Sequence, residues 1–330
     1  MFDPLLIGHR EVRQRLLDRI QAGRIGGSLL FTGPEGIGKR RVAMELAQRE
    51  LCFRGDACGQ CEGCRMFKGE LPVELPNFLR IAPEGKAGLI RIGAIREDDL
   101  VEGGVIAWAH RAPPPRCHRW IMVEDAHRLN GASANMLLKI LEEPPAGTHF
   151  LLITHRPEAM LQTIRSRCER IPFLPLGAAE AWAVARRAGW EDPQRPAWTA
   201  LAAGTLRYLE PEAFQRASDQ LDAWLELAFG ARFQDSAGPL LPEKNATVAQ
   251  SEQVGQCLEL LLLILADVTR QREGKAPRLG PWAEQVARLG STGLAVAEPQ
   301  GLVFEALRNL GRNPSAESLL REISMGLRAS

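Results

Sequence analysis

The sequence predicts an α/β core built around a phosphate-binding loop, followed by an all-helical C-terminal part. Three short apolar stretches alternate with helical patterns, which indicates a parallel sheet covered by helices on both faces. The stretches are Ser28–Thr32, Trp120–Ala126 and His149–His155. The segment GPEGIGK, residues 33–39, directly follows the first of them. Strand-like stretches end at about residue 173, beyond which Ala, Leu, Arg and Trp dominate.

Length and composition restrict the classes of function. At roughly 100–200 residues a domain, 330 residues suggest two or three domains. Lys and Arg total 41 against 40 Asp and Glu, which gives no electrostatic argument for DNA binding by the chain alone. No apolar run approaches the ~20 residues of a membrane helix, and the N-terminus lacks a signal-peptide layout. We therefore expect a cytoplasmic protein without a membrane partner, in which cysteines stay reduced.

The glycine-rich segment lies between a predicted strand and a predicted helix. Residues 10–24 carry apolar residues at helical spacing, and glycines from Gly23 onward end that helix. The strand 28–32 then leads into the loop, and residues 39–51 return to helical periodicity. In this setting backbone N–H groups and the helix dipole bind phosphates. The candidate phosphate-binding residues are Gly33, Gly36, Gly38 and Lys39.

One position of the loop departs from the phosphate-loop pattern. The pattern G-x-x-x-x-G-K continues with Ser or Thr, whose hydroxyl binds Mg²⁺, but this chain has Arg40 there. A guanidinium cannot coordinate a cation, and its charge repels one. Three readings stay open: a working ATPase, a protein that binds ATP or ADP without hydrolysis, and a glycine turn that only joins a strand to a helix.

The second apolar strand ends in acidic residues. In phosphate-loop ATPases such a strand ends in an Asp that helps to hold Mg²⁺, and Asp125 takes that place after the run IMV. Hydrolysing proteins of this kind follow it with a Glu that activates water, whereas this chain has Ala126. Loss of a catalytic base typically lowers the rate by about 10²–10⁴-fold. We therefore expect no useful ATPase activity. The alternative interpretation is that Glu124 and Asp125 are ordinary polar residues at a strand end.

Four closely spaced cysteines form the pattern C-x₅-C-x₂-C-x₂-C. They are Cys52, Cys58, Cys61 and Cys64. Four thiolates enclose a single tetrahedral Zn²⁺ and leave no position for water, so the predicted site is structural. An iron–sulfur centre competes chemically, because its ligands are also thiolates. A redox or fortuitous cluster is the third reading.

The segment TIRSRC places two arginines around a serine near the end of the α/β part. An exposed arginine here is suited to reach the terminal phosphate of a nucleotide on a neighbouring subunit, as arginine fingers do. Surface arginines are far more often only solvated, so this segment alone does not carry the assignment.

In this order the motifs resemble those of the AAA+ clamp-loader family. The resemblance covers about residues 5–210 and rests on five segments. They are AGRIGGSLLFTGPEGIGK, CGQCEGC, VEDAHRLNGASANMLLKILEEPP, TIRSRCERIPF and AAGTLRYL. It implies an AAA+ core at residues 1–173 with a zinc module inserted at about residues 50–66. It further implies a small helical lid at residues 174–210 and a helical collar for oligomerisation at residues 211–330.

The family's functional residues transfer to single positions. The Ser-Arg-Cys triplet makes Arg167 the arginine finger that acts in trans. Thr154 falls at the position of the first sensor and Arg207 near that of the second. Together with Asp125 and the loop, both would line a degenerate nucleotide site.

The resemblance also implies a function. The chain would be a non-motor (stator) subunit of the replicative clamp loader of DNA polymerase III. That assembly is a hetero-pentamer of delta- and gamma/tau-type subunits, which loads the sliding clamp onto primed DNA. Arg40 and Ala126 fit a subunit that does not hydrolyse ATP. Two alternatives stay open: an ATP-hydrolysing motor subunit of the same family, and a zinc-dependent nucleic-acid-binding module.

Overall fold

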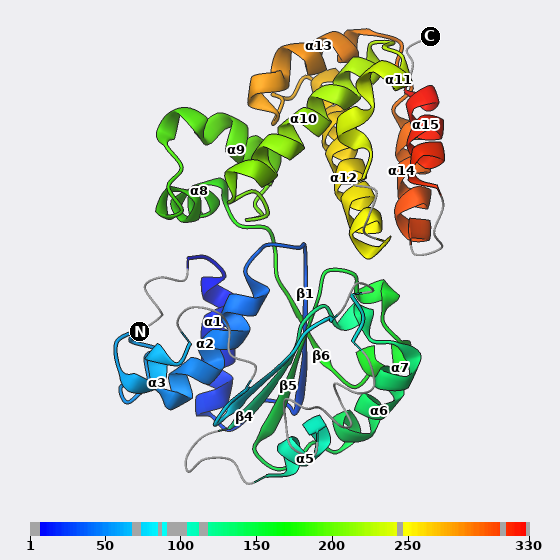
Figure 1. Ribbon diagram of the computed structural model, residues 1–330. Coiled ribbons are helices and arrows are strands. Elements are labelled where there is room, and N and C mark those ends of the chain that lie inside the picture. The colour runs from blue at the N-terminus through cyan, green and yellow to red at the C-terminus, as the bar shows by residue number, and fades with distance from the viewer. Residues whose placement is uncertain are drawn as a thin grey trace. The chain divides into compact units, whose positions relative to one another are not determined.

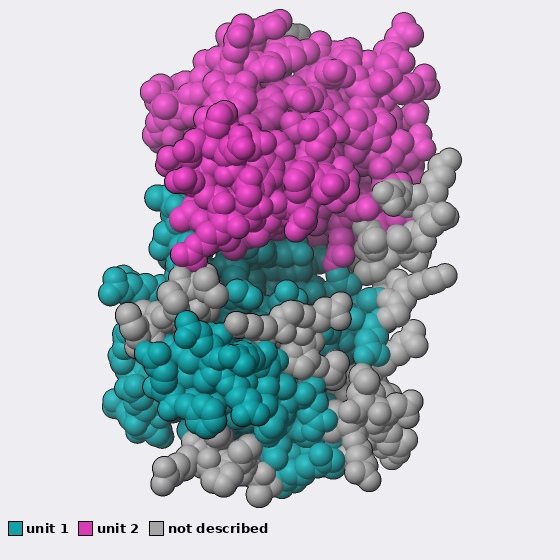
Figure 2. Space-filling view, turned by 60° about the vertical axis from the view of Figure 1, so that its left-hand side comes forward, with its two compact units in different colours: residues 1–181 teal, residues 182–330 magenta. Residues whose placement is uncertain are grey.

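The chain forms two compact units, residues 1–181 and 182–330, shown in different colours in Figure 2. This computed structural model describes residues 7–67, 74–84, 88–90, 104–111, 118–242, 247–310 and 315–327. Each unit is described by itself below. The finer division into core, lid and collar stays a prediction.

A six-stranded sheet forms the centre of the first unit (Figure 1). Across the sheet the strands run in the order β2 (Glu74–Leu75), β3 (Phe78–Ile81), β4 (Arg119–Val123), β5 (Thr148–Thr154), β1 (Ser28–Thr32) and β6 (Glu169–Pro172). The pair β2–β3 is antiparallel, and the other neighbouring strands are parallel. Strand β1, which leads into the glycine-rich loop, therefore lies inside the sheet.

The three apolar stretches are confirmed as strands β1, β4 and β5. The prediction for β4 was too long at its end, because the strand stops at Val123 and Asp125 turns into the left-handed region with φ 45°. Strands β2, β3 and β6 were not predicted. They are short, and β6 has the sequence ERIP with three exposed positions, so hydrophobic periodicity does not mark it.

Helices cover both faces of the sheet, as the sequence predicts. Helices α1 (Arg10–Gln21) and α2 (Lys39–Leu51) share a core cluster with Leu29 and Phe31 of β1. Leu30, between these two residues, points to the opposite face, because successive strand side chains alternate. There it joins a cluster with the helices of the opposite face, which are α5 (Gly104–His110), α6 (Gly131–Glu142) and α7 (Gln162–Arg165).

Helix α6 shows how local sequence sets an element boundary. Its N-cap Asn130 accepts a hydrogen bond from the Ser133 backbone N–H at 2.8 Å, which satisfies one of the orphan donors of the first turn. Leu137 and Leu141, one helical turn apart, are buried against the sheet. The helix ends at Glu142, two residues before Pro144.

The second unit is helical in the parts that the structure describes. Its helices are α9 (Arg195–Ala202), α10 (Pro211–Ala228), α11 (Phe233–Ser236), α12 (Thr247–Arg272), α13 (Ala283–Ser291), α14 (Ala297–Asn309) and α15 (Ala316–Gly326). Helix α8 (Ala178–Arg187) crosses the boundary between the units. The apolar run from Leu258 is confirmed as a buried part of α12. Throughout the described ranges, no helix combines the length and the apolar character that crossing a membrane requires.

Buried Asp267 of α12 closes the turn that follows this helix. Its Oδ2 accepts hydrogen bonds from the backbone N–H groups of Arg278 and Leu279, each at 2.7 Å. These bonds satisfy a carboxylate that is only 2% exposed, which would otherwise be costly to bury. The Gly/Pro-rich interruption predicted near residues 273–281 is thus an ordered connection between α12 and α13.

We expect the first unit to lose stability in mild acid through His149. Burial lowers the pKa of His149 from 6.5 to about 4. Nδ1 contacts the Gly26 carbonyl at 2.9 Å, whereas Nε2 finds no hydrogen-bond partner among the described residues. Between pH 6.5 and about 4 the imidazole of His149 is protonated in the unfolded chain but neutral in the folded chain, so the free energy of unfolding decreases as the pH falls. The loss reaches roughly 3 kcal/mol near pH 4.

Urea unfolding of the full chain at pH 7.5 and pH 5 measures this effect. His149→Gln removes the titrating group and should reduce the pH dependence. His110→Gln, at an exposed position of α5, is the matched control and should retain it. An equal pH dependence in all three proteins would refute the assignment to His149.

Candidate nucleotide and metal sites

The predicted nucleotide residues of the first unit lie at one edge of the sheet. The glycine-rich loop follows β1, Asp125 follows β4, and Thr154 is the last residue of β5. Strand β5 pairs in parallel with both β1 and β4, so the carboxyl ends of the three strands are neighbours. Ligands of open α/β sheets bind at this edge. The fold therefore brings these three parts together, as expected.

The backbone conformation of the loop requires glycine at several positions. Gly33 has φ 139°, and a Cβ at this position would lie 2.3 Å from the Phe173 carbonyl oxygen. Gly36 has φ 72° and Gly38 has φ 97°. Side chains rarely adopt these angles, so another residue would strain the turn. Gly38 directly precedes the first residue of α2, so the loop leads into the N-terminus of a helix, where anions bind.

Lys39 is turned into the loop. Its side chain is buried, and Nζ donates hydrogen bonds to the Gly33 carbonyl at 2.7 Å and to the Pro34 carbonyl at 2.6 Å. The Lys39 ammonium group is thus bound by backbone carbonyl oxygens of the loop itself. A bound phosphate would exchange one or both of these contacts for charge-assisted hydrogen bonds, which are stronger.

His9 supports the loop from outside and was not predicted from the sequence. Its Nε2 donates to the Ile37 carbonyl at 2.5 Å, and its ring packs edge-on against Phe173 with centroids 4.9 Å apart. Burial lowers the pKa of His9, which favours the neutral imidazole. The contact joins residues that are distant in sequence, so no local pattern could have shown it.

Arg40, at the position of the Mg²⁺-binding hydroxyl, forms part of an ion-pair network. Its guanidinium lies 3.7 Å from Oε2 of Glu124, the residue after β4. Arg80 of β3 donates to both oxygens of the same carboxylate, at 2.9 and 3.0 Å. Glu124 is therefore engaged by two cations. The sequence shows that Arg40 replaces a metal-binding hydroxyl. The structure adds that Arg40 pairs with Glu124.

Asp125 keeps its charge, but the catalytic base is absent. Burial acts to raise the pKa of Asp125, yet its close contact with His155 and the nearby positive charge of Arg128 outweigh it and lower that pKa. The next residue, Ala126, is 2% exposed and begins a short 3₁₀ turn. A methyl group at this position cannot activate water, and the absence of ATPase activity stays a prediction.

Thr154, the predicted first sensor, is fully buried at the end of β5. Its Oγ1 accepts a hydrogen bond from the Arg156 backbone N–H at 3.0 Å and contacts Nδ1 of His127 at 3.1 Å. Burial, reinforced by the charge of His155, lowers the pKa of His127 to about 3. Thr154 thus contacts the imidazole of His127, a residue that was not predicted for this site.

Arg207, the predicted second sensor, belongs to the second unit. Its Nη1 donates to Oε2 of Glu259 on α12 at 2.6 Å. Arg207 also borders a cavity of about 450 Å³ within this unit, together with Tyr208, Arg216 and Gln220. These contacts are compatible with a structural role. A nucleotide contact of Arg207 stays a prediction.

Arg167, the predicted arginine finger, lies directly after the short helix α7. Its Nη2 is 2.6 Å from Oε1 of Glu142 at the end of α6, and its Nη1 donates to the Thr163 carbonyl at 3.0 Å. The side chain is 36% exposed, whereas the adjacent Cys168 is buried. The triplet therefore anchors the backbone through its cysteine and presents its arginine to solvent, held by one exposed ion pair.

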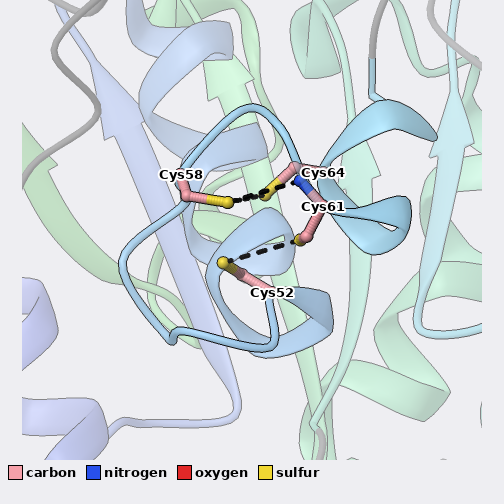
Figure 3. A group of neighbouring side chains, drawn as sticks. All are labelled: Cys52, Cys58, Cys61 and Cys64. Atoms are coloured by element: carbon pink, nitrogen blue, oxygen red, sulfur yellow. Dashed lines mark hydrogen bonds between the residues drawn. The ribbon is translucent and has the colours of Figure 1, made fainter.

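The four cysteines converge on a point that fits one metal ion (Figure 3). Their sulfur atoms all lie within 4.8 Å of one another. The distance between Cys58 Sγ and Cys64 Sγ is 3.9 Å, and that between Cys52 Sγ and Cys61 Sγ is 3.8 Å. Bonds of ~2.3 Å to a tetrahedral Zn²⁺ place sulfur atoms about 3.8 Å apart. The cluster thus matches a single tetrahedral ion and is too small to enclose several irons.

The local chain explains how the sulfur atoms are directed inward. Cys52 follows α2, and Cys61 is the N-cap of the short helix α3 (Glu62–Arg65). The Cys61 backbone N–H points at Cys58 Sγ at 3.4 Å, which orients the thiolate. Burial raises the pKa of Cys64 to about 12, so this thiol ionises only with a cation beside it.

The chain is similar to subunits of a bacterial DNA polymerase. A family model described as DNA polymerase III, delta subunit, matches residues 8–177. DNA polymerase III subunit delta' of Pseudomonas aeruginosa is 36% identical over 158 residues, which cover 46% of this chain and 45% of that protein. DNA polymerase III subunit gamma/tau of Mycobacterium tuberculosis is 34% identical over 171 residues, 51% of this chain and 28% of that protein. The matches span less than half the length of these curated relatives.

A comparison with solved structures gives matches of low sequence identity. A DNA polymerase III gamma subunit-related protein from Thermotoga maritima covers 96% of this chain and 98% of its own, with 18% sequence identity and a TM-score of 0.45.

Proposed function

The chain belongs to the DNA polymerase III delta-subunit family and is of the delta-prime type, and from this we propose that it is a stator of the replicative clamp loader. A stator binds its neighbours and contributes to their ATP sites but hydrolyses no ATP itself. Its partners would be delta- and gamma/tau-type subunits in a hetero-pentamer that places the sliding clamp on primed DNA.

The observation that carries the proposal is the ion-pair network around Glu124. A motor subunit needs a hydroxyl and an acidic residue around Mg²⁺. Here Arg40 stands in the place of the hydroxyl and lies 3.7 Å from Glu124, which Arg80 also engages. Ala126 cannot serve as a base. Two separate parts of the hydrolytic machinery are thus missing, which supports the stator over the motor subunit.

The geometry of the glycine-rich loop supports nucleotide binding. Gly33 and Gly38 have positive φ angles, and the Lys39 side chain is turned into the loop. We therefore propose that ATP or ADP binds here without magnesium-dependent turnover. Thr154 would lie beside the bound phosphates, and Arg207 stays the candidate second sensor.

Arg167 would be the catalytic contribution of this subunit. Its guanidinium is exposed and is held by Glu142 and a backbone carbonyl. Exposed ion pairs contribute little, about 0–1 kcal/mol, so a more favourable anion can displace Glu142. The γ-phosphate of ATP on the adjacent subunit would be such an anion, because the guanidinium fork matches phosphate oxygens.

The cysteine cluster would hold a structural Zn²⁺, and the helices of the second unit would form the lid and collar. The zinc assignment is supported by the sulfur–sulfur distances of 3.8 and 3.9 Å. Four thiolates saturate a tetrahedral ion, so this metal would stabilise the loop between α2 and α3 and take no part in hydrolysis.

We expect the isolated chain to bind nucleotide with an affinity that Mg²⁺ changes by no more than about 3-fold, because no hydroxyl at position 40 holds the ion. Calorimetric titration of ATP with and without Mg²⁺ measures this. Arg40→Thr restores the hydroxyl and should make the affinity Mg²⁺-dependent. Lys39→Ala should abolish binding but barely affect clamp loading.

Steady phosphate release from the isolated chain, lost in Lys39→Ala, would contradict the proposal and favour the motor subunit. The zinc-dependent nucleic-acid-binding module makes a different prediction, namely tight DNA binding by the chain alone that weakens steeply with salt. The balance of 41 basic and 40 acidic residues favours weak binding.

A further inference from the structure

A second group of metal-binding side chains converges at the carboxyl ends of β4 and β5. Asp125, His127 and His155 each offer one ligand atom, and these atoms all lie within 4.8 Å of one another. Asp125 and His127 come from the turn after β4, and His155 directly follows β5. The group is distinct from the cysteine cluster, and neither hydrolysis nor the arginine finger uses its imidazoles.

We propose that these three residues bind one divalent transition-metal ion of the Zn²⁺ type. The distance from Asp125 Oδ1 to His155 Nδ1 is 3.6 Å. Two ligand atoms on a tetrahedral ion with bonds of ~2.0–2.2 Å lie about 3.3–3.6 Å apart. The spacing of these two atoms therefore already suits two ligands of one ion. The ligand atom of His127 lies within 4.8 Å of both, so a small adjustment of its side chain would bring it to the ion. Water would complete the coordination.

A hydrogen bond orients the third ligand. Nδ1 of His127 is 3.1 Å from Oγ1 of the fully buried Thr154, so Nε2 is the nitrogen that would bind the metal. Proteins commonly fix metal-binding imidazoles through a hydrogen bond at the other ring nitrogen. The His127 ring also packs edge-on against His155, with centroids 4.5 Å apart. Both imidazoles are thus held in place before an ion arrives.

The ligand set selects the kind of ion. Two imidazoles and one carboxylate suit Zn²⁺, Co²⁺ or Ni²⁺, whereas Mg²⁺ prefers oxygen ligands. Asp125 is 41% exposed, so an ion can reach it from solvent. Arg128 lies 3.9 Å from the other carboxylate oxygen, Oδ2, and leaves Oδ1 for the metal. The positive charge of Arg128 weakens the attraction for a cation, so we expect lower affinity than at the four cysteines.

Cobalt titration of the full chain, with its cysteines first loaded with Zn²⁺, tests this site. Co²⁺ should add one equivalent and give the visible bands of nitrogen and oxygen ligands, without thiolate charge-transfer absorption. His127→Ala and His155→Ala should each weaken binding at least about 10-fold, the smaller effect known for residues that only orient a ligand. His110→Ala, at an exposed position of α5, should leave the affinity unchanged.

If a histidine variant does not fold, Asp125→Asn provides a second test of the same metal site. Asp125 has φ 45°, which asparagine also tolerates, so this variant should retain the far-ultraviolet circular dichroism spectrum and lose tight Co²⁺ binding. The proposal is overturned if no second equivalent binds, if Asp125→Asn binds Co²⁺ as well as the unaltered chain, or if equimolar Mg²⁺ displaces Co²⁺.

Discussion

Replacing Arg167 with alanine should leave the isolated chain folded and disable one ATP site of the assembled clamp loader. Arginine fingers raise the rate of phosphoryl transfer about 10³–10⁵-fold, because they neutralise charge that develops on the transferred group. In reconstituted complexes, ATP hydrolysis at the adjoining site should therefore fall about 10³-fold or more. Removing the exposed pair with Glu142 should change the free energy of unfolding by at most about 1 kcal/mol.

Two variants distinguish a specific role of Arg167 in hydrolysis from a general effect of losing a positive charge. Arg165→Ala removes an exposed arginine from the short helix α7, two residues before Arg167, and should leave hydrolysis intact. Arg167→Lys keeps the charge but loses the planar fork, so it should recover only part of the rate. Single-turnover hydrolysis, with the other sites of the ring inactivated, isolates the relevant step. Wild-type rates in Arg167→Ala would eliminate the arginine finger from the proposed function.

The second large effect concerns the metal of the cysteine cluster. Elemental analysis of the purified chain should find zinc at the four cysteines, and Cys61→Ser should lower the affinity of this site by about 10²–10³-fold. This estimate divides the roughly 10–16 kcal/mol that zinc contributes in zinc-finger peptides among four thiolates. Competition with a coloured chelator measures the change. The melting temperature of the first unit should fall with the loss of the ion.

Phe53→Ala is the matched control for this loop. Phe53 lies between Cys52 and Cys58 but is 82% exposed, so its removal should leave metal affinity unchanged. Iron with visible absorbance in place of zinc would replace the zinc assignment. Full stability of Cys61→Ser after metal removal would show that the cluster has no structural role.

The glycine-rich loop shows which features a local sequence pattern can predict. Its strand, turn and helix could be predicted because hydrophobic periodicity, glycine spacing and a lysine all lie within one short segment. The structure confirms β1 at the predicted residues and α2 at residues 39–51. The cysteine cluster could be predicted for the same reason, since all four ligands follow one another closely in sequence. The short strands β2, β3 and β6 could not, because segments of two to four residues are too short to show a periodic signal.

The sequence by itself determined the α/β core, the loop, the four-cysteine motif and the two substitutions, Arg40 and Ala126, that weigh against hydrolysis. Tertiary structure alone decided that Arg40 meets Glu124, that Glu142 holds Arg167, and that Asp125, His127 and His155 converge. The physical reason is that these contacts depend on which strands and helices pack next to one another. That arrangement arises from packing between distant segments, and hydrophobic periodicity within a single segment does not specify it.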